Sequence, residues 1–248
     1  MNLNTKTSLS EVRKRCRRDN ADANNRLHWF SSKFSVYFSF LFIRMGLSAD
    51  FVTILFFLFG LFGAALYSFN SMILSIIGYV GWRLHIIIDM SDGDVARFNK
   101  SFSIRGAYWD AVIHLILNPL YFLSVSYSFY LQFSNNIFLM VGGASCLSMS
   151  ILMGVKSTFY KAKFLNKELY DPSTRLESNS SSFSNRVFVF LSEALGMEGF
   201  ILMTIVARYV ASECFAFVLM LLFFSSNIMA AVWKFISLSY YGYYRTKN

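Results

Sequence analysis

The chain has 248 residues, of which 55% are hydrophobic and only 15% are charged. Soluble domains usually carry about 25% charged residues, so this composition argues against a soluble protein. The formal net charge is +9, but there is no nucleic-acid motif and no nucleic-acid partner is expected. The three cysteines at 16, 146 and 214 lack metal-binding spacing and are interpreted as free thiols.

The amino-terminal 25 residues are polar and basic, with the run KRCRR at 14–18. No apolar segment with a small-residue cleavage site follows directly, so we expect no removable signal peptide. The segment 26–47 mixes Trp and Phe with Lys33 and Arg44. This mixture favours an amphipathic helix lying in the membrane interface, and the alternative is a short additional core helix.

Residues 48–240 then show apolar segments that approach the ~20 residues needed to cross a bilayer. The fifth segment is ambiguous: it is either Val187–Ala207 or a later window that starts near Gly199. A Ser-rich loop at 165–186 precedes it, and 241–248 form a tail. The expected spans are Phe51–Phe69, Met72–Ile88, Ala111–Gln132, Ile137–Val155, this fifth segment and Cys214–Trp233. The predicted fold is therefore an all-α integral membrane protein with six transmembrane helices preceded by an amphipathic interfacial helix.

The basic residues predict the orientation of these spans. If every span crosses, 21 of the 23 Lys and Arg residues lie on one side. The positive-inside rule then places both termini in the cytoplasm. The net charge also favours contact with anionic membrane lipids.

An acidic stretch interrupts the apolar pattern at residues 89–114, DMSDGDVARFNKSFSIRGAYWDAVIH. On one helix, Asp89 and Asp92 are three residues apart; on the next, Asp110 and His114 are four apart, so each pair shares a helix face. A helical hairpin would bring the two faces together, and the converging carboxylates would require a cation. Hard divalent cations such as Mg²⁺ or Mn²⁺ suit oxygen ligands and clamp phosphates. Taken one at a time, such Asp and Gly residues are more often helix caps and packing contacts.

The stretch resembles the signature of the CDP-alcohol phosphotransferases, D-x2-D-G-x2-A-R-x8-G-x3-D-x3-D. Residues 89–97 match it in full, and Gly106 and Asp110 follow at the correct spacing. His114 stands where the family has its last Asp. The segment SADFVT at 48–53 is similar to the family's PN-x-x-T opening, with Thr53 retained and Asp50 in place of Asn.

The resemblance implies a membrane transferase that moves a substituted phosphate from a CDP-alcohol, with CDP-diacylglycerol as the expected donor, to an acceptor alcohol and releases CMP. It implies one or two Mg²⁺ or Mn²⁺ ions on Asp89, Asp92 and Asp110. It also implies a homodimer in phospholipid or related lipid biosynthesis, in a bacterial inner membrane with a cytoplasmic active site. The residues implied to border or hold the donor are Thr53, Gly93, Ala96, Arg97, Ser103 and Gly106.

The histidine at 114 leaves three possibilities open. His114 is the general base that takes the proton of the acceptor, or the site has changed its metal content or its acceptor. In the third possibility, the protein has lost transfer activity and acts as a donor-binding or partner subunit. A membrane transporter is a further alternative, because Asp and His within a membrane can form an ion path.

Overall fold

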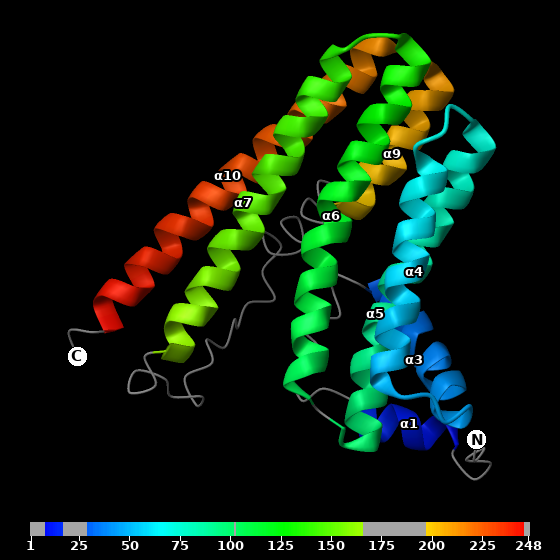
Figure 1. Ribbon diagram of the computed structural model, residues 1–248, viewed down its shortest axis with the longest axis vertical. Coiled ribbons are helices and arrows are strands. Elements are labelled where there is room, and N and C mark those ends of the chain that lie inside the picture. Colours follow the sequence, from blue (N-terminus) through cyan, green and yellow to red (C-terminus); the bar gives the residue numbers. More distant parts are fainter. Residues whose placement is uncertain (1–7, 17–28, 102, 166–196, 246–248) are drawn as a thin grey trace, which may run out of the picture.

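The computed structural model describes residues 8–16, 29–101, 103–165 and 197–245, and the regular structure of this part is entirely helical (Figure 1). The prediction of an all-helical protein is confirmed for these residues. The helices are α1 (Leu9–Cys16), α3 (Trp29–Arg44), α4 (Ala49–Tyr67), α5 (Met72–Asn99), α6 (Ile104–Phe133), α7 (Ile137–Leu165), α9 (Met197–Val210) and α10 (Glu213–Arg245).

Five of these helices are long and apolar enough to cross a membrane: α4, α5, α6, α7 and α10. The expected fifth span corresponds to α9, which has only 14 residues and is therefore about 21 Å long. A hydrocarbon core is about 30 Å thick, so the described part of α9 is too short to cross it unaided. The structure thus shows five candidate spans, and the count of six stays a prediction. The loop 165–186 lies almost wholly outside the described residues.

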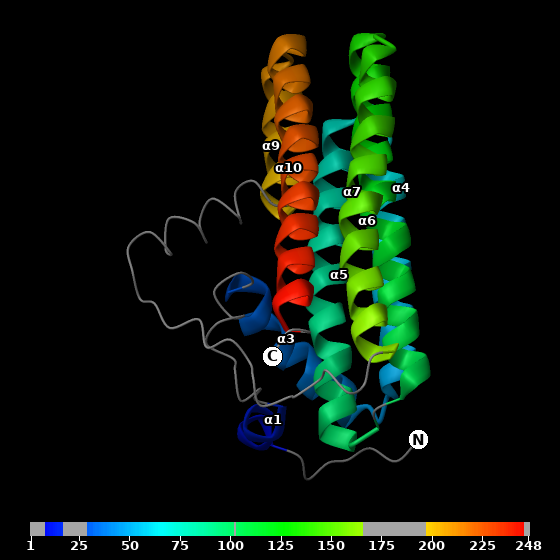
Figure 2. The ribbon, with the colours of Figure 1, turned by 90° about the vertical axis from the view of Figure 1, so that its left-hand side faces the viewer.

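The long helices form two groups, which Figures 1 and 2 show from two sides. α4 packs against both α5 and α6, whereas α5 and α6 contact each other at few positions. α7 runs beside α6 and also packs on α10, which in turn contacts α9. The result is that α4 packs against both helices of the α5–α6 hairpin, whose side chains meet beside it.

Glycines bring α4 and α5 together. A Cβ atom on Gly78 of α5 would stand 2.7 Å from the carbonyl oxygen of Gly63 and 2.8 Å from the backbone nitrogen of Tyr67, both in α4. Gly81 of α5 faces α4 in the same way, with its Cβ position 3.0 Å from the Cα atom of Gly63. Small residues at membrane helix contacts allow such backbone approach, and here they fix the position of α5 relative to α4.

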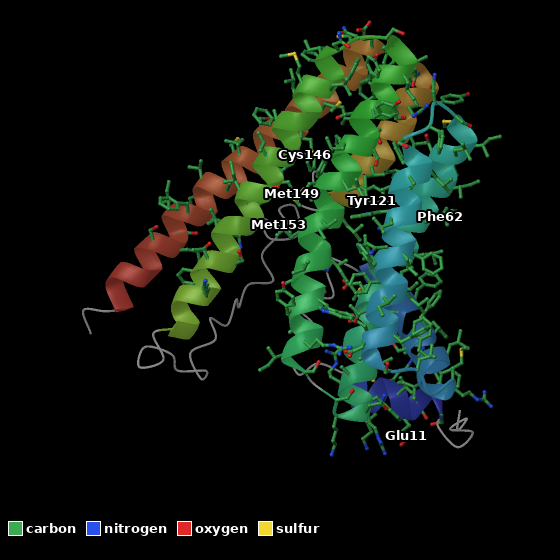
Figure 3. All side chains as sticks on the ribbon, in the orientation of Figure 1. Glu11, Phe62, Tyr121, Cys146, Met149 and Met153 are labelled. Carbon is green, nitrogen blue, oxygen red and sulfur yellow. The ribbon has the colours of Figure 1, made fainter. Side chains whose placement is uncertain are left out.

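The core lies between α4, α5 and α6, and apolar side chains also cover the outer surface. Tyr121 of α6 is fully buried and packs on Trp82 of α5, with ring centroids 3.9 Å apart. In Figure 3 it points toward the α4–α5 pair, whereas Phe62 of α4 points away from the molecule. Exposed Phe62, Met140 and Trp233 are typical of surfaces that contact lipid tails.

The segment predicted as an interfacial helix is α3, and it packs against α5. Ser31, Ser35 and Ser39 are buried, while Phe34 and Leu41 on other faces are exposed. The Oγ atom of Ser91 in α5 donates to the carbonyl of Ser35 at 3.0 Å, so polar groups join the two helices. This helix turns its polar side toward the protein; its position relative to a membrane stays a prediction.

The acidic hairpin lies at one end of the molecule. Figure 1 shows α1, the last turn of α5 and the first turn of α6 at the lower end, whereas α10 runs downward but ends higher up, on the left. The turns that join α4 to α5, α6 to α7 and α9 to α10 lie at the opposite end. The acidic stretch 89–114 therefore lies at the end that also carries α1.

Candidate metal and phosphate site

The α5–α6 hairpin places the acidic residues. α5 ends at Lys100, whose φ of 52° is left-handed, and the backbone N–H of Ser101 caps it by donating to the Ala96 carbonyl at 2.9 Å. α6 begins at Ile104. Its N-cap is Ser103, whose Oγ atom accepts from the backbone N–H of Gly106 at 2.9 Å. This short connection returns the chain so that the first turns of α6 lie beside the last turns of α5.

Asp89, Asp110 and His114 come together across this hairpin. The Nε2 atom of His114 lies 3.3 Å from Oδ1 of Asp89 and 3.3 Å from Oδ1 of Asp110. One potential ligand atom from each residue lies within 4.8 Å of the others. The convergence predicted for Asp89 and Asp110 is therefore present, and the histidine lies between their carboxylates.

The donor atoms fit a divalent cation of the predicted kind. Ligands around an octahedral ion with bonds of about 2.1 Å stand about 3 Å apart when adjacent and about 4.2 Å apart when opposite. The three donors span at most 4.8 Å, so a small inward movement would bring all three to one ion. Two carboxylates and an imidazole suit Mn²⁺ well, whereas Mg²⁺ would rely on the carboxylates and water.

Asp92 lies outside that group of three donors. Its Oδ2 atom accepts from the hydroxyl of Thr53, which lies 2.9 Å away on α4. The Thr53 oxygen is also 3.0 Å from the carbonyl of Ala49, so its single hydrogen serves one acceptor or is shared. Asp92 is close enough to Asp89 and Asp110 for their charges to act on it. The structure thus assigns Thr53 a role in orienting Asp92.

An aromatic and imidazole layer lies beneath the cluster. The ring of Phe56 stacks on His114 with centroids 6.0 Å apart, and the ring of His85 meets His114 edge-on at 5.8 Å. His85 is 1% exposed, and its Nδ1 atom lies 3.0 Å from the Phe56 carbonyl. A carbonyl oxygen only accepts, so this nitrogen carries the proton. His85 thus makes a core hydrogen bond directly behind the site.

Arg97 is held by residues that the sequence pattern did not connect to it. Its Nη2 atom pairs with Oδ1 of Asp94, and Oδ2 of Asp94 accepts from the buried hydroxyl of Ser39 at 2.9 Å. The Nε atom of Arg97 is buried without a partner. The signature spacing leaves Asp94 out of the metal-binding set, and Asp94 is not among the three grouped donors. It pairs with Arg97 instead.

The remaining predicted residues lie on the last turns of α5 and at the start of α6. Gly93 and Ala96 are half-buried on α5. A Cβ atom on Gly106 would approach Ser103 Oγ at 3.1 Å and Asp50 Oδ1 at 3.6 Å, so little room remains there. Ser103, predicted to contact a donor, serves in this structure as the cap of α6.

An ion pair that the sequence analysis missed lies beside Gly106. Oδ2 of Asp50 on α4 is 2.9 Å from Nη2 of Arg105 on α6. The signal was present in the sequence, because Asp50 departs from the family pattern at a helix start. Its partner 55 positions later became apparent only from the packing of α4 on α6.

The arrangement defines a class of protein: a helical protein with several helices fit for a membrane and an acidic, metal-competent site at one end of them. No protein-family model matches the chain, and no curated protein sequence matches it either.

Proposed function

We propose that the protein is a membrane transferase that moves a substituted phosphate group from a CDP-alcohol, with CDP-diacylglycerol as the donor, to an acceptor alcohol. The observation that carries this proposal is the meeting of Asp89, Asp110 and His114 between α5 and α6, with their donor atoms within 4.8 Å. The resemblance of residues 89–110 to the CDP-alcohol phosphotransferase signature supports the same reaction.

The roles of the residues follow from their positions. Asp89 and Asp110 would hold one Mg²⁺ or Mn²⁺ ion, and Asp92, oriented by Thr53, would complete the acidic set for a second. Such ions neutralise the pyrophosphate charge and stabilise the leaving CMP. Arg97, held by Asp94, would meet a phosphate oxygen with its guanidinium. Gly93 and Ala96 would leave space for the cytidine, and Gly106 would border it.

His114 would act as the base. The oxygen of the acceptor hydroxyl forms a bond to the phosphorus that carries the alcohol, its proton passes to the imidazole, and the bond from that phosphorus to the CMP oxygen breaks. A neutral imidazole near pH 7 suits such a transfer. Asp89 and Asp110, each 3.3 Å from Nε2, would accept the hydrogen on that nitrogen and so orient the ring; Nδ1 would then take the proton, and the two carboxylates would stabilise the charged form after the transfer.

A second candidate, a family member that binds the donor without turnover, has one specific observation in its favour. His114 lies between the two carboxylates where a cation would bind, and a charged imidazolium would satisfy them both. A transporter is less well supported, because among the described residues the Asp and His side chains cluster at one end of the helices.

The test is CMP release by the purified protein in lipid or detergent, with CDP-diacylglycerol, Mg²⁺ or Mn²⁺ and a panel of alcohols screened by product mass. We expect metal-dependent CMP release that EDTA removes. Asp92→Asn and Asp110→Asn should abolish it, whereas Leu115→Ala, on the exposed face of α6, should retain it. Donor binding without CMP release would favour the second candidate. Absence of both donor and metal binding would overturn the proposal.

The proposal includes a topology of six spans with the site and both termini in the cytoplasm of a bacterium, α3 in the interface, and a homodimer in the membrane. It is supported by the basic residues around the acidic end and by the direction of α10, which runs toward the end that carries α1. Labelling of single cysteines by an impermeant reagent, at residues 100 and 135, tests the topology. Labelling of both positions from the same side would contradict it.

A further inference from the structure

A second polar cluster lies at the end of the helices opposite to the acidic site. The turns at 68–71, 134–136 and 211–212 meet there, at the upper end of Figure 1. Hydrogen bonds join them: Nδ2 of Asn70 donates to the Leu131 carbonyl at 3.3 Å, and Nε2 of Gln132 donates to the Arg208 carbonyl at 3.3 Å. Residues beside the α4–α5 and α6–α7 turns therefore both contact Arg208, which precedes the α9–α10 turn.

Arg208, in the last turn of α9, is only 7% exposed. Its Nη2 atom donates to Oδ1 of Asn70 at 2.9 Å, but its Nη1 atom is buried without any partner. Within the described residues, no carboxylate lies within ion-pair distance of this guanidinium. Glu213, the nearest acid along the chain, accepts from Asn135 at 2.7 Å. The positive charge of Arg208 is thus left without a counter-charge.

A buried charge in this state is costly, since its burial is compensated only when it is paired and hydrogen-bonded. The neighbouring Gln132 also has an unsatisfied atom, because its Oε1 is buried without a donor. The cluster therefore offers an unused cationic donor on Arg208 and an unused acceptor on Gln132, the side chain that bonds the backbone carbonyl of Arg208. A guanidinium is shaped to bind phosphate oxygens, and an amide oxygen takes a hydroxyl or ammonium hydrogen.

We propose that Arg208 and Gln132 form a phosphate-binding site at the end of the helices opposite to the acidic cluster. Its ligand is a phosphate group, carried by a phospholipid headgroup or present as free phosphate. The ligand enters beside the exposed Asn70. Tyr209 and Val210, 81% and 57% exposed, provide an apolar rim next to it that suits the chains of a lipid. This site is independent of the function proposed above.

The test is hydrogen–deuterium exchange of the full-length protein in detergent, with peptides covering 66–72, 130–137 and 205–214. Three additions are compared: phosphatidylglycerol, inorganic phosphate, and diacylglycerol, which has the same chains but no phosphate. We expect exchange at these peptides to slow about tenfold with phosphatidylglycerol, as for a charge-assisted hydrogen bond, and to be unchanged with diacylglycerol. Slowing by inorganic phosphate alone would identify the free ion as the ligand. Equal exchange under all three conditions would overturn the proposal.

Two arginine variants locate the effect. Arg208→Gln removes the charge and should abolish the protection, and Arg208→Lys, which keeps the charge but loses the planar donor pair, should retain part of it. Arg44→Gln, at an exposed arginine near the acidic end, is the matched control and should behave like the natural chain. Protection that persists in Arg208→Gln would place the phosphate elsewhere. If that variant does not fold, the comparison of lipids on the natural chain still decides the question.

Discussion

The Nε2 atom of His114 on α6 lies 3.3 Å from Oδ1 of Asp89 on α5, so this side chain joins the two helices at their acidic end. Asp110, one turn before His114, reaches the same nitrogen from the other side. His114 therefore places an imidazole, where the signature has an acid, beside the two carboxylates that the proposed cation requires.

Replacing His114 by alanine is expected to reduce the rate of CMP release roughly 10²–10⁴-fold, which is the range for loss of a general base. Donor binding should change far less, because Arg97 and the carboxylates remain. The measurement is single-turnover CMP release beside a donor-binding assay. A variant that keeps its rate would remove His114 from the chemistry, and a variant that loses binding equally would make it a ligand.

Thr53→Val should weaken Mn²⁺ binding about 10–100-fold, the usual effect of removing a group that orients a metal ligand. The reason is that Thr53 is the hydrogen-bond donor, at 2.9 Å, to Oδ2 of Asp92, and valine has nearly the same shape without the hydroxyl. Titration with Mn²⁺ followed by electron paramagnetic resonance measures the affinity.

Thr53→Ser is the control for that substitution, since it retains the hydroxyl and should bind nearly as well as the natural chain. Thr53 is 3% exposed, so a packing defect would reduce stability in both variants. If valine and serine weaken binding equally, the hydrogen bond to Asp92 has no part in the metal site.

The sequence predicted the parts of this site that lie within single helices. The spacing of Asp110 and His114 places both on one face of α6 whatever the tertiary structure, and the short segment between residues 97 and 106 favours a hairpin. The meeting of Asp89 with Asp110 and His114 then follows from the hairpin alone. The long apolar segments were recognisable as helices because their length and composition are also local properties of the sequence.

Contacts between distant segments were not predictable in this way. Ser39 reaches Asp94 across 55 residues of chain, and Asp94 in turn pairs with Arg97. No periodicity within α3 or α5 indicates which serine meets which aspartate.

Gly78→Ala is expected to destabilise the protein by about 1–3 kcal/mol or more, because the added methyl group would stand 2.7–2.8 Å from backbone atoms of α4. Backbone atoms cannot turn aside as a flexible side chain does, so the two helices must separate. The unfolding midpoint in detergent, followed by circular dichroism, measures the change. Gly143→Ala on α7 is the control, since its Cβ position has no atom within 4 Å. That variant should be neutral or slightly stabilised, and equal loss in both would contradict close packing at Gly78.

Cys16 links α1 to the site, because its Sγ atom donates to the Asp94 carbonyl at 3.3 Å. Burial, reinforced by the charge of Asp94, raises the pKa of this thiol from 9.0 to about 11. The thiol is therefore protonated while α1 is docked, and an undocked chain releases its proton from about pH 9 upward. The stabilisation of the docked state is complete below pH 9 and is lost as the pH rises toward 11.

Alkylation of Cys16 in a Cys146→Ser, Cys214→Ser background tests this dependence. At pH 8 the folded protein should react about 100-fold more slowly than the same chain unfolded in dodecyl sulfate, because a pKa higher by two units leaves about 100-fold less thiolate. Above pH 9 the rate should rise steeply as α1 undocks. A variant that keeps only the exposed Cys214 controls for reagent and detergent. If folded and unfolded Cys16 react equally at pH 8, α1 is not docked on α5.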